Sequence, residues 1–411
     1  MKNNNFQLPK IIKNVIIITK NKEDYMKKTI NNTVETIKPS GIRKFFDMAS
    51  QYENVISLTV GEPNFPTPRP IKRAAIRAIE EGKTNYTTNR GLLELRKEIC
   101  KFYNNKYNVQ YNPETECIVT TGGSEGIDIA LRTILNQGDE VLVTDPGYVA
   151  YAPLVKLAGG IPSIIKLNEK DKFKLTPEIL SKAITSNTKA IILNYPCNPT
   201  GAIMTKEDYS KIISILKDSG IFIIADEVYS ELIYDNKFCS IASFPEIKEQ
   251  CIVINSFSKT YLMTGWRLGY LLAPEYLSKI ILKIHQFATM SASTPAQYGA
   301  LEGLQCCDSA VKNMKKTYQE RRDYCISQLN EIGLNTFKPE GAFYIFPSIK
   351  TTGLSSDEFC KKLLDIENVA CVPGNAFGEA GEGYIRISYA YSLEELEIAF
   401  TKIKKFIQNL K

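Results

Sequence analysis

The sequence predicts an α/β protein, with a large domain built on an open, mostly parallel sheet and a smaller α+β domain. Three observations support this fold class. The 411 residues exceed what one ordinary hydrophobic core holds. Short apolar runs alternate with amphipathic helical patterns, and after about residue 300 longer charged helices take over. We expect 68–300 to form the large domain, 29–67 and 301–411 the small one, and 1–28 a flexible extension.

Five apolar runs are the expected strands of the large domain. Each has near-continuous apolar character, as parallel strands covered on both faces do. They are CIVTT ending at Thr121, EVLVTD at Asp145, AIILNY at Tyr195, IFIIAD at Asp226 and CIVINS at Ser256. Between the first two, apolar residues recur at helical spacing from Ile127 to Leu135, and Gly138 follows. Strand, helix and strand in succession indicate a parallel sheet.

The flanking segments predict further elements. RPIKRAAIRAIEEG is typical of a helix, because Pro70 stands near its start and Gly82 just past its end. The segment MTGWRLGY is expected to return to the sheet as the next strand, with Trp266 as a packing residue. In the C-terminal part, GAFYIFP predicts one short strand, and VACVPG and YIRISYA predict a pair.

Charge and composition argue against several classes of partner. Residues 1–28 hold five of the six net positive charges, so the remaining chain is nearly neutral and no nucleic-acid partner is expected. No apolar run reaches the roughly 18 residues of a membrane span, so no membrane partner is expected either. Ten cysteines without C-x-x-C spacing indicate a reducing compartment, hence a cytoplasmic protein. The only histidine, His285, argues against a His-based triad or a metal site.

The N-terminal segment 1–28 resembles no targeting signal. It lacks the continuous apolar core of a signal peptide, and it has none of the Arg and Ser of an organellar transit peptide. We interpret it as a flexible extension. A second hypothesis is that Met26 is the natural start, which the intact mass of the natively expressed protein would decide.

Candidate ligand residues follow the strands, because ligands of open α/β sheets bind beyond the carboxyl ends of the strands. After CIVTT, Gly122-Gly123-Ser124 opens a helix whose N–H groups can bind an anion, although a tight turn without a ligand fits as well. After AIILNY, the turn PCNPTG holds Asn198 at the strand mouth. It is either an ordinary turn residue or a ligand.

Two further strands end in charged side chains. Asp226 is the last residue of an apolar strand. A carboxylate next to a buried strand is costly to desolvate without a partner, so we expect a cation there, either a structural Arg or a protonated ring nitrogen. Lys259 follows the next strand. It either reaches solvent or is desolvated, and a desolvated Lys has the lowered pKa that suits Schiff-base chemistry. Arg267 offers a planar fork for phosphate or carboxylate.

An anion site, an Asp for a pyridine nitrogen, a Tyr and an Asn for a phenolic oxygen, and a Lys for an aldehyde together match pyridoxal 5′-phosphate (PLP). Over about residues 29–408 the chain resembles the class I/II aminotransferases of PLP fold type I, and within them the aminotransferase A or aspartate/aromatic-type subgroup. The motifs that carry the resemblance are TVGEPNFPTP, YTTNRGLLELR, TTGGSEGI, NYPCNPTG, ADEVYSEL, SFSKTYLMTGWRLGY, GAFYIFP and YIRISYA. It implies a seven-stranded sheet and a homodimer with shared active sites.

The resemblance assigns catalytic roles to three residues. Lys259 would bind the cofactor aldehyde as a Schiff base and move the substrate proton. Asp226 would keep the ring nitrogen protonated, and Tyr229, together with Asn198, would hydrogen-bond the ring oxygen. Tyr148 would stack on the ring. The reaction implied is ping-pong transfer of an amino group from an L-amino acid to a 2-oxo acid.

The resemblance also assigns binding residues. Arg386 would bind the substrate α-carboxylate, beside Gly61 and Asn198. Tyr86 would reach the cofactor phosphate from the other subunit. The remaining phosphate contacts would be Gly122, Gly123, Ser124, Ser256 and Arg267.

The substrate stays open at this point. Ser124 stands where an aspartate-specific branch of the family has a Lys, so aromatic or neutral donors with 2-oxoglutarate as acceptor are the first hypothesis, and aspartate the second. The aromatic residues Tyr25 and Phe377 do not decide between them. A cysteine-conjugate β-lyase would use the same Lys and Arg. A transcription regulator with this fold as its effector domain needs a DNA-binding domain, and residues 1–28 are too few for one.

Overall fold

The computed structural model describes residues 30–39 and 41–410, which fall into two compact units, up to residue 39 and beyond it. The described part of the first unit contains one helix, α3 (Asn32–Thr36). The predicted N-terminal extension, including Tyr25 and Met26, lies outside the described residues, and the expectations about it stay predictions. All elements discussed below belong to the second unit.

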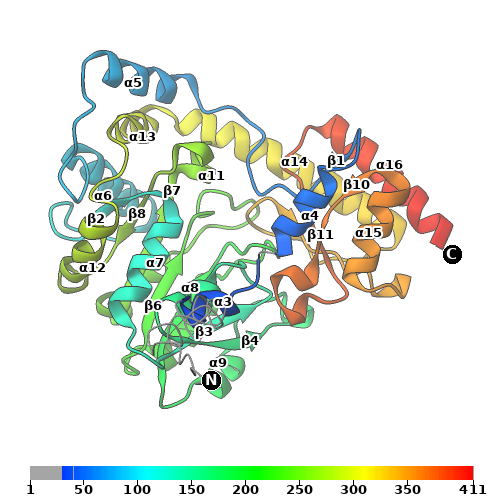
Figure 1. Cartoon of the computed structure of the whole chain (residues 1–411), viewed down its shortest axis with the longest axis horizontal. Coiled ribbons are helices and arrows are strands. Elements are labelled where there is room, and N and C mark those ends of the chain that lie inside the picture. The colour runs from blue at the N-terminus through cyan, green and yellow to red at the C-terminus, as the bar shows by residue number, and fades with distance from the viewer. Residues whose placement is uncertain (1–29, 40, 411) are drawn as a thin grey trace, which may run out of the picture. The chain divides into compact units, whose positions relative to one another are not determined.

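A seven-stranded sheet forms the centre of the second unit (Figure 1). The strands lie in the order β2-β8-β7-β6-β5-β3-β4. Neighbouring strands pair in parallel, except that β8 is antiparallel to both of its neighbours. The sheet is therefore mostly parallel, as predicted. Its strands are β2 (Cys117–Thr120), β3 (Glu140–Asp145), β4 (Ile161–Lys166), β5 (Thr188–Asn194), β6 (Phe222–Asp226), β7 (Cys251–Ser256) and β8 (Gly269–Leu272).

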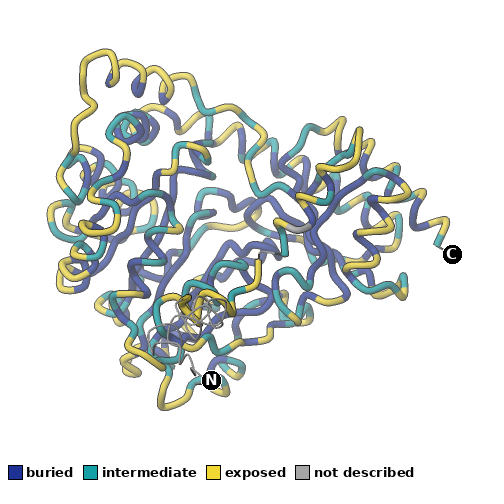
Figure 2. Tube along the Cα trace, in the orientation of Figure 1, coloured by how far each residue is buried: buried dark blue, intermediate teal, exposed yellow. Residues whose placement is uncertain are grey.

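Helices cover both faces of this sheet, and this explains why its central strands are apolar at nearly every position. In β5, Ile191 and Leu193 join one apolar cluster, and Ala190 and Ile192 join the other. Figure 2 shows the central strands as buried. One face packs on α7 (Gly122–Ile134), α8 (Tyr151–Leu157) and α12 (Glu275–Ala288). The other packs on α5 (Arg69–Glu80), α6 (Leu93–Tyr107), α9 (Pro177–Ala183), α10 (Lys206–Leu216) and α13 (Thr294–Cys306).

The predicted strands and helices are present, with two differences. The segment MTGWRLGY joins the sheet only from Gly269 onward. Before it lies the 3-10 helix η4 (Thr264–Trp266), and Arg267 has a left-handed φ of 52°, which turns the chain before β8 begins. Trp266 packs as expected and donates its indole N–H to Thr67 Oγ1 at 3.1 Å. The edge strand β4 has exposed residues and Pro162, so it lacks the apolar run that marks the other strands.

The C-terminal part adds two small sheets. VACVPG divides in two: β10 (Val369–Ala370) pairs in parallel with β1 (Ile56–Ser57), and β11 (Val372–Pro373) pairs with β12 (Ile385–Ser388), as predicted for the pair. β12 also pairs with β9 (Tyr344–Ile345). The helices of this part are α4 (Gly41–Ala49), α14 (Asp308–Ile332), α15 (Ser356–Glu367) and α16 (Leu393–Leu410). The domain boundaries at residues 68 and 300 stay a prediction.

Among the described residues, no helix combines the length and the apolar character needed to cross a membrane. The described residues also contain no group of three or more His, Cys, Asp or Glu side chains placed to hold a metal ion.

Candidate active site

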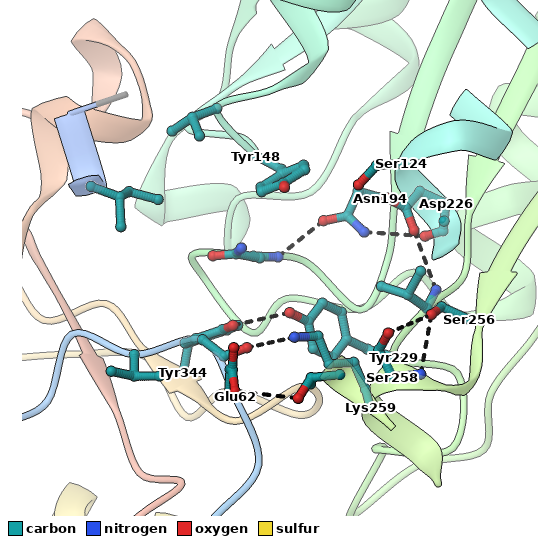
Figure 3. Close-up of a pocket in the computed structure, with 18 of the residues that line it drawn as sticks. Glu62, Ser124, Tyr148, Asn194, Asp226, Tyr229, Ser256, Ser258, Lys259 and Tyr344 are labelled. Carbon is teal, nitrogen blue, oxygen red and sulfur yellow. Dashed lines mark hydrogen bonds between the residues drawn. The ribbon is translucent and has the colours of Figure 1, made fainter. Parts of the chain in front are cut away.

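A cavity of about 910 Å³ opens at the carboxyl ends of the central strands (Figure 3). Its size is that of a pocket for a small molecule or cofactor. Most of the residues singled out from the sequence line it together, although they come from separate parts of the chain. These are Gly61, Gly123, Ser124, Tyr148, Asn198, Asp226, Tyr229, Ser256, Lys259, Arg267 and Arg386. Gly122 lies directly behind this lining, against Arg267.

Lys259 projects into the cavity from α11 (Phe257–Thr260), a short helix that begins where β7 ends. The Ser256 side chain caps α11 by accepting a hydrogen bond from the Ser258 N–H at 3.1 Å. The Lys259 amine donates to the Gly61 carbonyl oxygen and lies 6.0 Å from the centre of the Tyr229 ring. Burial lowers the pKa of Lys259 from 10.5 to about 8. The amine is thus held inside the molecule, in a setting that favours its neutral, nucleophilic form.

Asp226 ends β6, and no cationic side chain forms a hydrogen bond or ion pair with it among the described residues. Its carboxylate accepts a hydrogen bond from the Tyr151 hydroxyl at 2.6 Å and one from the Val228 N–H at 3.3 Å. Burial raises its pKa from 3.8 to about 6. The structural Arg that was one of two expected partners is therefore not there, and the carboxylate faces the cavity (Figure 3). A cation brought by a ligand would satisfy it.

The start of α7 and Arg267 lie together and form a candidate anion cradle. Gly122 has a φ of +76°, and a Cβ there would lie 2.6 Å from a guanidinium nitrogen of Arg267. Only glycine fits both the conformation and this approach. Gly123 and Ser124 follow in the first turn of α7, whose N–H groups have no partner within the helix. A phosphate is the kind of group that such a cradle binds.

A buried pair fixes the start of α7 from behind. The His285 ring, fully buried on α12, bonds Glu125 Oε1 through Nδ1 at 2.7 Å. The other oxygen of Glu125 accepts a hydrogen bond from the Thr121 N–H, directly before Gly122. The only histidine of the chain is thus a packing residue behind the cradle.

Arg386 presents a buried guanidinium to the cavity from β12. One terminal nitrogen donates to Asn198 Oδ1 at 2.9 Å and the other to the Thr59 carbonyl oxygen. Its Nε is buried without a hydrogen-bond partner among the described residues. The guanidinium carbon lies 4.4 Å from the centre of the Tyr344 ring and 4.9 Å from the centre of the Phe377 ring. A buried Arg with no acid beside it and an unused donor is suited to a carboxylate ligand.

Several residues of the site were not predicted from the sequence. Tyr344 donates to or accepts from Tyr229 at 3.0 Å between hydroxyl oxygens, and a Cβ on Gly61 would lie 2.8 Å from the Tyr344 hydroxyl. Asn194, the last residue of β5, accepts the Asn198 N–H at 3.0 Å and donates to the Asp226 carbonyl at 3.1 Å. The rule that ligand residues follow strands could have found Asn194. Nothing local to the sequence points to Tyr344 or Tyr151, because their partners are far away in the chain.

Besides Gly122, two residues named from the sequence lie outside the cavity lining. Phe377 is buried beneath Arg386, so it supports that side chain and does not line the cavity. Tyr86 is 80% exposed, and its predicted contact with the phosphate of a second subunit stays a prediction.

The chain also matches a known protein family. Residues 53–403 match the family model described as aminotransferase class I and II. The chain belongs to this family. An aspartate aminotransferase of Pyrococcus abyssi is 43% identical over 385 residues, covering 93% of this chain and 99% of that protein. A protein of Bacillus subtilis named "putative aminotransferase YugH" is 48% identical over 378 residues, covering 92% of this chain and 98% of that protein.

A solved structure of a similar protein has the same fold as this chain. The aromatic aminotransferase from Pyrococcus horikoshii superposes with a TM-score of 0.85 at 42% identity, covering 89% of this chain and 99% of that one. The protein is therefore an α/β enzyme of PLP fold type I, with aminotransferase activity. The relatives differ in the substrate that their names print.

Proposed function

We propose that this aminotransferase binds PLP at Lys259 and transfers an amino group from an aromatic or neutral L-amino acid to a 2-oxo acid such as 2-oxoglutarate. One observation carries the proposal. A buried lysine amine with a lowered pKa and a buried carboxylate that forms no ion pair among the described residues line the same cavity. Such an amine and such a carboxylate are what the aldehyde and the ring nitrogen of PLP need.

The residues of the site fit PLP from end to end. Arg267, Ser256 and the first turn of α7 would hold the phosphate, and Asp226 would pair with the ring nitrogen. Tyr148 would lie on the ring face, Tyr229 and Asn198 would contact the ring oxygen, and Lys259 would bind the aldehyde. When bound, PLP supplies the aldehyde that condenses with amines and the ring that accepts the electrons of the substrate Cα–H bond.

The protein supplies proton transfer and orientation. In its neutral form, Lys259 Nζ can accept the proton from the substrate Cα, and in its charged form it can donate that proton to another atom. A pKa of about 8 allows both accepting and donating near neutral pH. Arg386 would bind the α-carboxylate of either substrate, and this fixes which bond at Cα faces the lysine. Asn198 accepts a hydrogen bond from Arg386 and would also contact the ring oxygen of the cofactor, so it connects the α-carboxylate site with the cofactor site.

The substrate proposal rests on the walls of the cavity. Ser124 contributes no charge at the start of α7, and Ile42, Phe46, Val60 and Val149 contribute apolar surface. These walls favour aromatic or neutral donors. Aspartate stays the second candidate, because an aspartate aminotransferase is among the relatives.

We infer that the active form is a homodimer in which Tyr86 of each subunit completes the site of the other. Its 80% exposure leaves the side chain available for that contact. Sedimentation analysis at assay concentration should give a dimer, and full activity of a monomer would contradict this.

A donor panel tests the function. Purified protein loaded with PLP is incubated with phenylalanine, tyrosine, leucine, alanine or aspartate and 2-oxoglutarate, and the glutamate formed is measured. We expect glutamate, fastest with an aromatic or neutral donor. In a parallel incubation, cystathionine without acceptor should release little pyruvate and thiol. Pyruvate and thiol without any glutamate would identify a β-lyase and contradict the proposal.

A further inference from the structure

The helix α4 presents a cation to the cavity that the roles above do not use. The basic residues lining the cavity are Arg43, Lys259, Arg267 and Arg386. The last three serve the cofactor and the α-carboxylate. Arg43, on α4, remains. Resting on the proposed function, we propose that Arg43 binds the second carboxylate of dicarboxylic 2-oxo acids and so determines which acceptors the enzyme uses.

The packing of α4 fixes which side faces the cavity. Phe45 and Ala49 are 7% and 6% exposed, and they join the apolar clusters of the C-terminal part. The helix is thereby anchored on one side. Ile42, Arg43 and Phe46 line the cavity from the same helix.

The Arg43 guanidinium is held only weakly. Among the described residues its one ion-pair partner is Asp47, one turn further along α4, with Arg43 Nε 3.3 Å from Asp47 Oδ1. Both side chains are largely exposed, 74% and 61%. An exposed pair at this spacing contributes little stability, so a ligand carboxylate can replace Asp47 at small cost.

Glu62 is an exposed acidic residue of the cavity lining, so a second substrate carboxylate is disfavoured beside it. Glu62 lines the cavity beside Gly61, the residue whose carbonyl bonds Lys259, and it accepts a hydrogen bond from the Thr264 hydroxyl at 3.2 Å. A second substrate carboxylate is repelled by Glu62 and attracted by Arg43. On the side of α7, Ser124 offers no charge to compete.

The same helix also provides a surface for neutral substrates. The Phe46 ring is 42% exposed, and the Arg43 guanidinium carbon lies 5.7 Å from its centre. An uncharged donor side chain can lie against Phe46 and Ile42 while Arg43 stays with Asp47 in solvent. A ping-pong enzyme binds donor and acceptor in the same place in turn, so one helix that offers both surfaces accounts for both.

The experiment compares acceptors in the full-length protein loaded with PLP. The variants are Arg43→Gln, Asp47→Asn and, as a matched control, Arg73→Gln, an exposed Arg on α5 outside the cavity. With the donor fixed, kcat/KM is measured for 2-oxoglutarate and oxaloacetate, and for pyruvate and phenylpyruvate. Arg43→Gln should lower kcat/KM about tenfold for the two dicarboxylic acceptors, mainly through KM, and leave the monocarboxylic ones within about twofold.

The remaining outcomes also decide. Asp47→Asn should leave dicarboxylic acceptors at or above the wild-type kcat/KM, because it frees Arg43, and Arg73→Gln should match the wild type. An equal loss for all four acceptors in Arg43→Gln, no loss at all, or a loss in Asp47→Asn would overturn the role of Arg43. Absence of transamination with every acceptor in the wild type would instead refute the proposed function.

Discussion

The two ends of the cavity are built in opposite ways. At the cofactor end, Asp226 and Ser256 are 4% and 5% exposed and sit at strand ends within an apolar sheet. At the α4 end, the side chain of Arg43 is 74% exposed, and Phe46 is 42% exposed. At the cofactor end, Asp226 and Lys259 are desolvated and held by hydrogen bonds. The α4 end has hydrated groups with few bonds, so it can change with little effect on the fold.

This difference separates residues that are needed for the chemistry from residues that select the substrate. Desolvated groups are costly without partners, so their identity is bound to the chemistry they perform. Hydrated groups on a helix surface are tolerated in many forms, so they can vary with the substrate. Substitutions at the first end should abolish activity, and substitutions at the second should redirect it.

The largest effect is expected for Lys259→Ala. Without the amine, no group in the described cavity can bind the aldehyde or move the Cα proton, so turnover should fall by about four orders of magnitude or more. The visible absorbance of the lysine-bound cofactor should disappear as well. Lys211→Ala, an exposed Lys on α10, is the control and should retain both. Retention of absorbance in Lys259→Ala would refute the assignment.

Asp226→Asn should have the next largest effect. A neutral amide cannot hold the proton of the ring nitrogen, so kcat should fall about 100- to 1000-fold while PLP stays bound. Absorbance titration with PLP separates binding from turnover. A variant that keeps kcat within a few fold would show that the carboxylate has no role at the ring.

The cofactor end is also the part that the sequence predicted best. Asp226 and Lys259 stand out because each follows a run of apolar residues, and the strand-end rule brings them to one edge of the sheet. Tyr151 and Tyr344 were missed, because their contacts with Asp226 and Tyr229 depend on packing between distant segments. The segment of α4 was not marked at all: its residues are ordinary for a surface helix, and only the folded chain shows that they line the cavity.

A smaller effect of the buried carboxylate should be visible in the protein without PLP. The pKa of Asp226 is about 6 in the folded chain and 3.8 ordinarily, so the folded state binds the proton more tightly. Asp226 therefore contributes about 3 kcal/mol to the free energy of unfolding below about pH 4, and this contribution is lost as pH rises through about 6.

Urea denaturation of the wild type and Asp226→Asn, both without PLP, measures this loss. The difference in stability between the two proteins should change across pH 4 to 6 in favour of the variant and stay constant above pH 7. Asp218→Asn, a substitution at an exposed position, is the matched control. A flat difference for Asp226→Asn would mean that the carboxylate is not desolvated.

The smallest effect is expected at the α4 end. Phe46→Ala should raise KM for aromatic donors about fivefold and leave KM for alanine unchanged, because only a large side chain reaches the removed ring. Steady-state kinetics with 2-oxoglutarate fixed would measure this. Ile398→Ala, an equally exposed apolar residue on α16, should change neither value. An equal rise for both donors would place Phe46 outside the substrate site.

Trp266 gives this enzyme a built-in optical probe. It is the only tryptophan of the chain, and it directly precedes Arg267, the side chain at the anion cradle. Its indole N–H is hydrogen-bonded to Thr67, which fixes the environment from which the indole emits. PLP bound to a lysine absorbs where indole emits, and energy transfer to it should quench that emission. The fluorescence of the unlabelled protein should therefore report cofactor loading and release in real time.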